Sequence, residues 1–338
     1  MENIGFCTNP DGARIAYSVI GNGPPMVMPP GYFAVINPYK TVPEIRNFFD
    51  SFARYHTVVM YDMHGAGLSD RKRTYFSLES ELSDLEAVVN YLKLDKVILN
   101  GSLIAGPVSI AYAAKFPDRV TQLILYGTYA HYGKYLSEEF KASIISLIRQ
   151  RKNWIGERTI ASLTNPRANV NELELFVGIQ QENTTPEFHA RWLEMFFTLD
   201  ATQLCPLVKS PTLVIHRKGD RVIVFKAGLE LASLIPNARF VPLEGETHYP
   251  FLGDAETVLR ISLQFLGDPV DDKQTSSAAQ LLTNKLCHDV FISFAYPDKD
   301  AAAKIYAYLK SNNISPFWCE DLAAGQDYPK LLGEAIRA

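Results

Sequence analysis

The fold is decided by the stretch Val97-Ile98-Leu99-Asn100-Gly101-Ser102-Leu103-Ile104-Ala105-Gly106. Its first residues are apolar, as in a buried strand, and the pattern at 107–114 predicts a helix directly after it. A tight turn that contains glycine lies between them. A sharp strand–turn–helix of this kind presents one side chain at its apex and needs small residues two positions before and after that apex. The register of the turn therefore decides which side chain is presented.

The turn has two candidate registers. With Leu103 at the apex, the two flanking positions hold the small residues Gly101 and Ala105. With Ser102 at the apex, the β-branched Ile104 would stand where the strand and the helix nearly touch, which is a poor fit. We therefore expect Leu103 at the apex, in the position where G-x-S-x-G enzymes hold a nucleophilic serine. A leucine side chain cannot attack a carbonyl group.

Length, charge and cysteine spacing limit the class of protein. A chain of 338 residues is long enough for more than one domain. The net charge of −4 excludes the basic surface expected for binding nucleic acid or an anionic membrane. The four cysteines have no spacing typical of metal ligands, so no metal site is predicted and a reducing compartment is favoured. Without signal-peptide features or an apolar run near the ~20 residues of a membrane span, we expect a cytoplasmic protein.

Strands and helices alternate in the first part of the chain, which predicts a mostly parallel sheet. The expected strands are 14–19, 25–28, 57–61, the apolar run before the turn, and 120–126, and a helix is expected at 79–92. The pattern then changes, because helical stretches at 138–150, 171–181 and 187–199 follow one another with no strand between them. We interpret about 129–205 as a helical cap over the carboxyl edge of the sheet, where pockets of α/β proteins form.

Two more strands, at 211–216 and 238–243, complete the expected sheet. Asp220 follows the first of these strands and His248 follows the second. An acid after one late strand and a histidine after the next is the order in which G-x-S-x-G hydrolases supply two members of a catalytic triad. The expected constellation in this chain is therefore Leu103, Asp220 and His248.

Five motifs extend this pattern over the first 267 residues: Asp11-Gly12-x-Arg14-Ile15-Ala16-Tyr17; Tyr61-Asp62 with Gly65-x-Gly67-x-Ser69-Asp70; Tyr112-Ala113-Ala114-x-x-Pro117-x-Arg119-Val120; Gly219-Asp220-Arg221-Val222; and Leu243-Glu244-Gly245-x-x-His248. They resemble the α/β-hydrolase superfamily, above all the hydrolase-like domains at the front of some bacterial adenylate cyclases and transcription regulators. The resemblance implies an α/β-hydrolase fold with a helical cap over residues 1–267.

The resemblance also assigns positions in the site. Counted from Pro117, the family spacing puts the nucleophile position at Leu103, and the backbone of Tyr32 and Ile104 falls where the family has its oxyanion hole. The chain departs from the family at Leu103 and at Pro30, where many members have a histidine. Because His248 then has no hydroxyl group to deprotonate, hydrolytic activity does not follow from the resemblance.

Three roles stay open for Asp220 and His248. They orient a polar group of a ligand, they are retained only as structure, or His248 activates a water molecule. A rival interpretation is an active hydrolase of esters or amides, which uses either Ser102 or a water molecule bound by His248.

Residues 268–286 are polar, contain proline and serine, and are typical of a linker. The pattern after them predicts a strand at 288–294, a helix at 300–309, a strand at 314–319, a loop at 320–327 and the start of a helix at 328–338. This order is half of a small flavodoxin-like α/β domain. Half a domain buries little surface, so a shortened form of a longer protein is the favoured interpretation.

Two stretches of this second part, Asp289-Val290-Phe291-Ile292-Ser293-Phe294 and Trp318 to Gln326, resemble the first strand, second strand and BB loop of a TIR domain. Residues 287–338 are therefore identified as the N-terminal half of such a domain, although Cys319 stands where an aspartate is usual. TIR domains assemble with their own kind or cleave NAD, and the glutamate for cleavage lies on a later helix that this chain does not contain. The site positions implied by the resemblance are Phe294, Ala295, Trp318, Asp321 and Gly325.

Together these patterns predict a sensor–effector protein of the bacterial immune or signalling type. The hydrolase-like domain is expected to be a pseudoenzyme that binds a small-molecule ligand or a protein trigger, and the TIR part is expected to self-associate in a homo-oligomer. No cofactor is predicted, and NAD is expected only as the substrate of a complete TIR domain. The resemblance implies a role such as defence against phage. A third interpretation, besides the active hydrolase, is a scaffold in which the hydrolase fold only supports oligomerisation.

Overall fold

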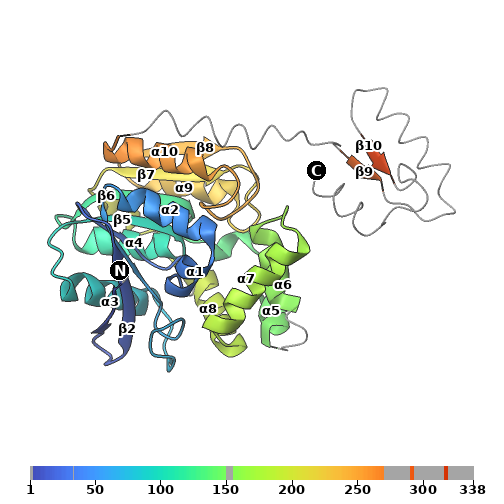
Figure 1. The fold of residues 1–338 in the computed structure, drawn as a ribbon, viewed down its shortest axis with the longest axis horizontal. Helices are drawn as coiled ribbons and strands as arrows, with labels where there is room; N and C mark the ends of the chain where they lie inside the picture. Colours follow the sequence, from blue (N-terminus) through green and yellow to red (C-terminus); the bar gives the residue numbers. More distant parts are fainter. Residues whose placement is uncertain (1–2, 33, 150–154, 270–289, 293–315, 319–338) are drawn as a thin grey trace. The chain divides into compact units, whose positions relative to one another are not determined.

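The structure is a computed structural model that describes residues 3–32, 34–149, 155–269, 290–292 and 316–318. The chain forms two compact units, Met1–Val270 and Asp271–Ala338 (Figure 1), and each is described by itself. The first unit contains every residue that sequence analysis places in the hydrolase-like site.

An eight-stranded sheet runs through the first unit in the order β1-β2-β4-β3-β5-β6-β7-β8. The strand β1 and its neighbour β2 pair antiparallel, as do β2 and β4, whereas all pairs from β4 to β8 are parallel. The expected parallel sheet is present, and two antiparallel pairs make it a mixed sheet. The strands are β1 (Asn3–Thr8), β2 (Arg14–Ile20), β3 (Pro25–Met28), β4 (Thr57–Tyr61), β5 (Val97–Leu103), β6 (Val120–Thr128), β7 (Thr212–Arg217) and β8 (Ala238–Leu243).

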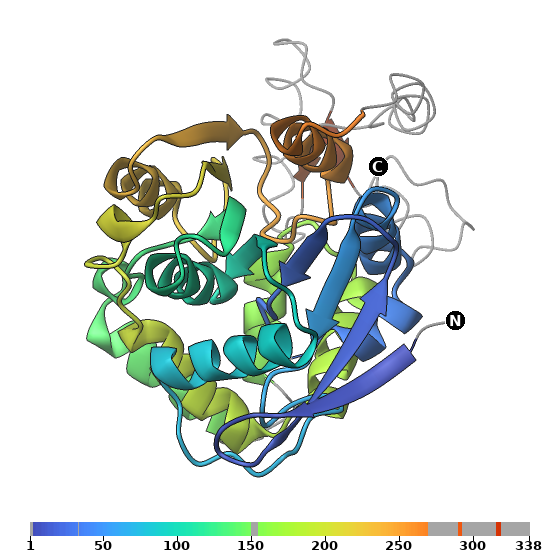
Figure 2. The same ribbon diagram turned by 90° about the vertical axis from the view of Figure 1, so that its left-hand side faces the viewer.

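Helices cover both faces of the sheet (Figure 2). Successive residues of a strand point to opposite faces, so Leu99 packs in one core cluster and its neighbour Ile98 in another. This double burial explains why the central strands are almost wholly apolar. On one face lie α3 (Leu78–Tyr91), α4 (Ala105–Lys115) and α9 (Phe225–Leu234); on the other lie α1 (Ile36–Thr41), α2 (Pro43–Ala53) and α10 (Ala255–Leu266).

Four helices between β6 and β7 form the expected cap. Three were predicted, but α6 was missed. Asn169 starts α7 with a capping box to Glu172, and Thr185 caps α8, whose first residue is Pro186. The cap helices are α5 (Glu138–Arg149), α6 (Ile155–Thr164), α7 (Val170–Asn183) and α8 (Pro186–Thr198), and the 3₁₀ turns Gly133–Tyr135 and Cys205–Leu207 flank them.

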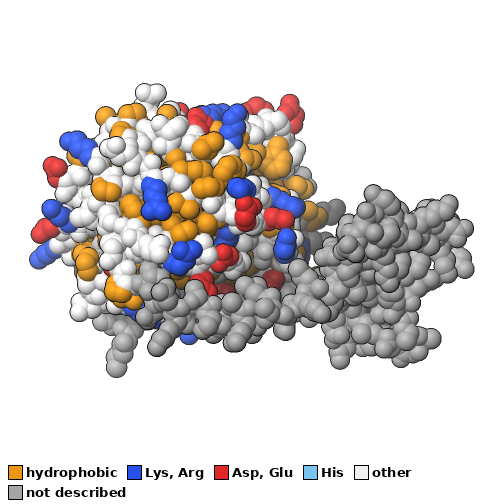
Figure 3. All heavy atoms as spheres, turned by 90° about the horizontal axis from the view of Figure 1, so that it is seen from above, with side chains coloured by type: hydrophobic (Ala, Val, Ile, Leu, Met, Phe, Trp, Pro, Cys, Tyr) orange, Lys and Arg blue, Asp and Glu red, His pale blue; other side chains and the backbone are white. Residues whose placement is uncertain are grey.

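The surface of the first unit is mixed in character. On the face drawn in Figure 3, hydrophobic side chains gather near the centre, and basic and acidic side chains are interspersed around them. Among the residues that the structure describes, no helix combines the length and the apolarity needed to cross a bilayer.

In the second unit the structure describes two short strands, β9 (Val290–Ile292) and β10 (Pro316–Trp318). They pair in parallel, with Phe317 opposite Phe291. Both lie within strands that the sequence predicts, and the parallel pairing is the one that a strand–helix–strand unit requires. The other predictions for this unit, including Phe294, Ala295, Asp321 and Gly325, lie outside the described residues, as does the linker from residue 270 onward.

Candidate functional site

Leu103 is the last residue of β5 and lies at the sharp turn into α4. Its backbone is left-handed, with φ of 51°. The two other described non-glycine residues with positive φ, Lys93 and Asn237, lie in ordinary turns beside a helix end and a strand start. A left-handed leucine costs roughly 1–3 kcal/mol and persists only where its surroundings impose it.

Those surroundings are two close approaches of the backbone. A Cβ atom on Gly101 would lie 2.6 Å from the carbonyl oxygen of Ala105, and one on Gly106 would lie 2.0 Å from Oγ1 of Thr128. Neither position has room for a side chain, and at Gly101 this is the steric requirement that the sequence register assumed. Ser102 lies one residue before the turn, and a Cβ on Gly31 would lie 2.5 Å from its Oγ.

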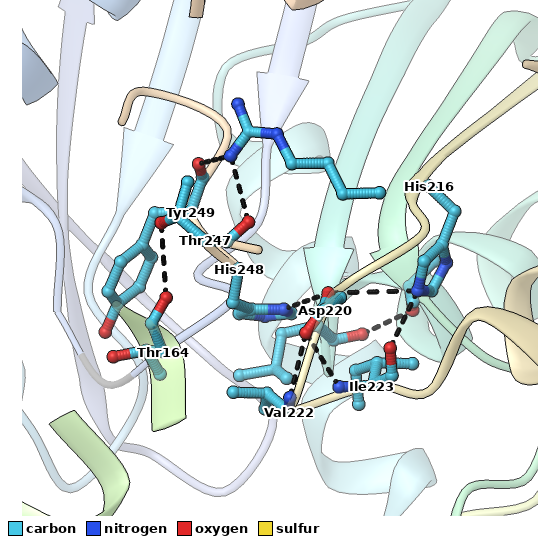
Figure 4. A network of polar contacts seen from close by, with 11 residues as sticks. Thr164, His216, Asp220, Val222, Ile223, Thr247, His248 and Tyr249 are labelled. Atoms are coloured by element: carbon cyan, nitrogen blue, oxygen red, sulfur yellow. Dashed lines mark hydrogen bonds and ion pairs between the residues drawn. The ribbon is translucent and has the colours of Figure 1, made fainter. Parts of the chain in front are cut away.

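Asp220 lies in the loop after β7, and its carboxylate is placed between His216 and His248 (Figure 4). Its Oδ2 is 2.7 Å from Nδ1 of His248 and 3.8 Å from Nε2 of His216. The backbone N–H groups of Val222 and Ile223 donate to Oδ1 at 2.8 and 3.1 Å, which fixes the carboxylate. The structure thus brings together two of the three residues of the predicted constellation by direct contact.

The loop that carries His248 is braced from two sides. Arg217, at the end of β7 and only 1% exposed, donates to the carbonyl oxygens of Thr247, Tyr249 and Leu252 at 2.7 to 3.0 Å. From the cap, the carbonyl oxygen of Thr164 accepts the backbone N–H of His248 at 2.7 Å. Sequence analysis missed both braces. A single arginine at the end of the strand predicted at 211–216 was the available signal for Arg217.

Burial and charge act in opposite directions on these groups. Burial alone would raise the pKa of Asp220, but the charge and hydrogen bond of His248, with His216 and the Ile223 N–H, lower it below the ordinary value. The carboxylate therefore stays ionised. Burial lowers the pKa of His216, which favours its neutral ring, and its Nε2 donates to the carbonyl oxygen of Ile223 at 2.8 Å.

Two cavities meet beside this site. The inner cavity, of ≈ 130 Å³, reaches between the sheet and the helices α2 and α10. The cap cavity, of ≈ 80 Å³, lies under α5, α6 and α8. Both are lined by Tyr32, Leu103, His248 and Tyr249. The apex residue and the histidine of the predicted constellation therefore border the same space, as does the predicted oxyanion-loop residue Tyr32.

Tyr32 also contacts the cap. Its Oη is 3.4 Å from Nε2 of His189, and its ring packs edge-on against Trp192. Burial lowers the pKa of His189, although the nearby Glu157, whose Oε1 is 3.8 Å from the ring, opposes this. Ile104, the other predicted oxyanion position, is fully buried and directly follows the apex. In the part of the chain that the structure describes, no group of three or more His, Cys, Asp or Glu side chains is arranged so that it could hold a metal ion.

Comparison with known proteins shows which family has this fold. The family described as "alpha/beta hydrolase fold" matches residues 24–255. The 2-hydroxy-6-oxo-2,4-heptadienoate hydrolase of Pseudomonas putida is 27% identical over 235 residues, which are 64% of this chain and 79% of that protein.

Two solved structures share the fold. A bromoperoxidase from Bacillus anthracis superposes with a TM-score of 0.69 at 19% identity and covers 79% of this chain and 100% of its own. An enol-lactonase from Burkholderia xenovorans has a TM-score of 0.64 at 22% identity and covers 78% and 100%. At these identities the likeness shows the fold alone. With the family match spanning most of its length, the chain belongs to the α/β-hydrolase fold family.

Proposed function

We propose that the first unit binds a small molecule in the joined cavities beside Leu103 and does not form an acyl-enzyme. The observation that carries the proposal is the left-handed backbone of Leu103 at the turn between β5 and α4. That position presents a hydrocarbon side chain, 5% exposed, to both cavities. Covalent catalysis at this position needs a nucleophile, and leucine supplies none.

In this proposal Asp220 and His248 orient a polar group of the ligand. Because the Asp220 carboxylate accepts from Nδ1 of His248, Nε2 of the neutral ring is left as a hydrogen-bond acceptor. Nε2 can accept a hydrogen bond from the hydroxyl group of a ligand or from water. The remaining contacts in the cavities are mostly apolar, as is usual for small-molecule sites.

A fluorophosphonate probe tests the proposal on the intact protein. Such probes react with activated serines, so we expect no adduct by mass spectrometry on the wild-type protein. The matched variant Ser102→Ala removes the hydroxyl group one residue before Leu103. An adduct on the wild-type protein that disappears in Ser102→Ala would overturn the proposal and identify an acyl-transfer enzyme.

A second candidate is hydrolysis by a water molecule that His248 activates. Two observations favour it: the intact pair of Asp220 and His248 at 2.7 Å, and the hydrolase name of the relative from Pseudomonas putida. It predicts slow turnover of ester or lactone substrates without a fluorophosphonate adduct, abolished by His248→Ala and reduced by Asp220→Asn. Binding without turnover favours the first candidate instead.

For the second unit we propose the N-terminal part of a TIR module that self-associates and, in a chain with the complete domain, cleaves NAD. The support is the two sequence stretches around β9 and β10 and the parallel pairing of these strands. Light scattering of the full chain across a concentration series tests it. We expect growth into dimers or larger assemblies, and a monomer at all concentrations would contradict self-association.

A further inference from the structure

The inner cavity enters the core on the side of the sheet opposite α3 and α4. Its walls come from the ends of the central strands and from Phe48 and Phe49 of α2 and Val258 and Ser262 of α10. Leu103 and His248 also line it. A molecule beside these two residues therefore has space toward α2 and α10 in the inner cavity and toward the cap in the cap cavity.

No charged side chain lines the inner cavity. Among the described residues that border it there is no lysine, arginine, aspartate or glutamate, and His248 is the single histidine. Transfer of an ionised carboxylate into such surroundings is strongly unfavourable unless a cation pairs with it. The lining therefore selects against anions.

Two buried polar atoms belong to side chains that line this cavity. Oη of Tyr126 and Oε1 of Gln180 have no hydrogen-bond partner among the residues that the structure describes. Each side chain is 3% exposed, so bulk water does not satisfy them in place of the protein. Buried polar groups almost always have a partner, and leaving one without costs about 1–3 kcal/mol. Both side chains line the inner cavity, one from β6 and one from the cap helix α7.

We propose that the inner cavity binds an uncharged organic molecule with an apolar body and one hydroxyl or carbonyl oxygen, and that it rejects carboxylates. The apolar body lies against α2 and α10. Tyr126 Oη donates to the ligand oxygen, and Gln180 Oε1 accepts from a ligand hydroxyl where there is one. This inference rests on the proposed function in one respect, since both place a ligand next to Leu103 and His248.

The volume sets the size of a suitable probe. Apolar cavities of about 150 Å³ hold a molecule as large as benzene, and the inner cavity of ≈ 130 Å³ is similar. Benzyl alcohol and benzoate differ in charge but hardly in size. Toluene has the same apolar body without an oxygen atom. These three compounds separate the contributions of apolar contact, hydrogen bonding and charge.

The test is a titration of the full chain with each compound, followed by NMR or calorimetry. We expect benzyl alcohol to bind with a Kd at least roughly tenfold lower than that of benzoate. Tyr126→Phe keeps the ring and removes the unpartnered hydroxyl, so the Kd of benzyl alcohol should rise roughly three- to tenfold while that of toluene is unchanged. Tyr126→Phe and the control variant Tyr112→Phe should both fold as the wild type does, because a hydroxyl without a partner contributes little stability.

Tyr112→Phe is the matched control. Tyr112 on α4 is also fully buried with an unpartnered hydroxyl among the described residues, but it lines neither cavity. Its loss should leave both Kd values unchanged. No saturable binding of benzyl alcohol, equal affinity for benzoate, or equal effects of the two tyrosine variants would overturn the inference. A fluorophosphonate adduct on Ser102 would overturn the proposed function and leave this selectivity intact.

Discussion

Thr128 Oγ1 donates a hydrogen bond of 2.5 Å to the carbonyl oxygen of Leu103. This bond links the end of β6 to the turn after β5, and Gly106 packs against the same threonine. The backbone at the turn is therefore held by groups other than the side chain of Leu103. A different side chain at this position should adopt the same place beside the cavities.

That relationship predicts that Leu103→Ser gains a nucleophile. The new hydroxyl would border the cavities that His248 also lines, with Asp220 already fixing the imidazole ring. We expect a fluorophosphonate adduct on the variant and ester hydrolysis roughly 10²–10⁴-fold above that of Leu103→Ala, the gain typical of a positioned general base. Mass spectrometry and a chromogenic ester assay measure these effects. A folded Leu103→Ser protein that stays unlabelled would show that the turn does not present residue 103 to His248.

The turn should also not tolerate a side chain at position 101. In Gly101→Ala the new Cβ would lie 2.6 Å from the backbone oxygen of Ala105, so the free energy of unfolding should fall by roughly 1–3 kcal/mol. Gly178→Ala is the control, because Gly178 lies inside α7 with nothing within 4 Å of a new Cβ. That substitution should raise the free energy of unfolding by roughly 0.5–1 kcal/mol. Denaturant unfolding of both variants measures the difference, and a loss in both would point to a general effect of alanine.

The sheet, the turn at Leu103 and the positions of Asp220 and His248 were predictable because they depend on local patterns. Buried parallel strands are apolar runs, and small residues around the turn are required by close backbone contact, so β5 and the register at Leu103 follow from short stretches of sequence. The same holds for Asp220 and His248, which follow consecutive late strands. The antiparallel β1, near the chain terminus, gave no such signal and was missed.

The remaining features depend on packing between distant segments. The inner cavity exists because strands, α2 and α10 leave space between them, and no single stretch encodes that space. Helix α6, which sequence analysis missed, carries the Thr164 hydrogen bond to the distant His248 loop. Arg217 contacts residues 30 to 35 positions away, which a pattern with a period of two or 3.6 does not detect.

Arg217 should support the His248 loop more than the sheet. Arg217→Met keeps the apolar stem on β7 but removes the donors to the part-buried carbonyl oxygens of Thr247, Tyr249 and Leu252. We expect a loss of roughly 2–4 kcal/mol in the free energy of unfolding, since hydrogen bonds from a charged donor contribute about 1.5–3 kcal/mol each and losses are not additive. Hydrogen exchange should show faster exchange at residues 247–252 than at β5. Arg158→Met, at an exposed ion pair with Glu174, is the control and should change little. Uniform acceleration of exchange would contradict a local role.

Glu81 on α3 should make the protein less stable as the pH rises toward neutrality. Burial raises the pKa of this carboxyl to about 7, against an opposing effect of Arg73 and with a further rise from Asp84. The folded state then holds a proton that the unfolded state, with a pKa of 4.5, has lost, so the stabilisation is complete below pH 4.5 and disappears as the pH rises through about 7. Glu81→Gln mimics the protonated form. In this variant Arg73 still donates hydrogen bonds to the carbonyl oxygens of Tyr75 and His64 and to Oγ of Ser80.

The free energy of unfolding of Glu81→Gln, relative to wild type, should therefore increase between pH 5 and pH 8, by up to about 3 kcal/mol at 1.36 kcal/mol per pKa unit. Denaturant unfolding at a series of pH values measures it. Glu79→Gln, an exposed carboxylate on the same helix, shows what removal of one charge does without burial. A Glu81→Gln profile parallel to wild type would mean that the Arg73 ion pair, at 2.5 Å, outweighs burial and keeps Glu81 ionised in the folded protein.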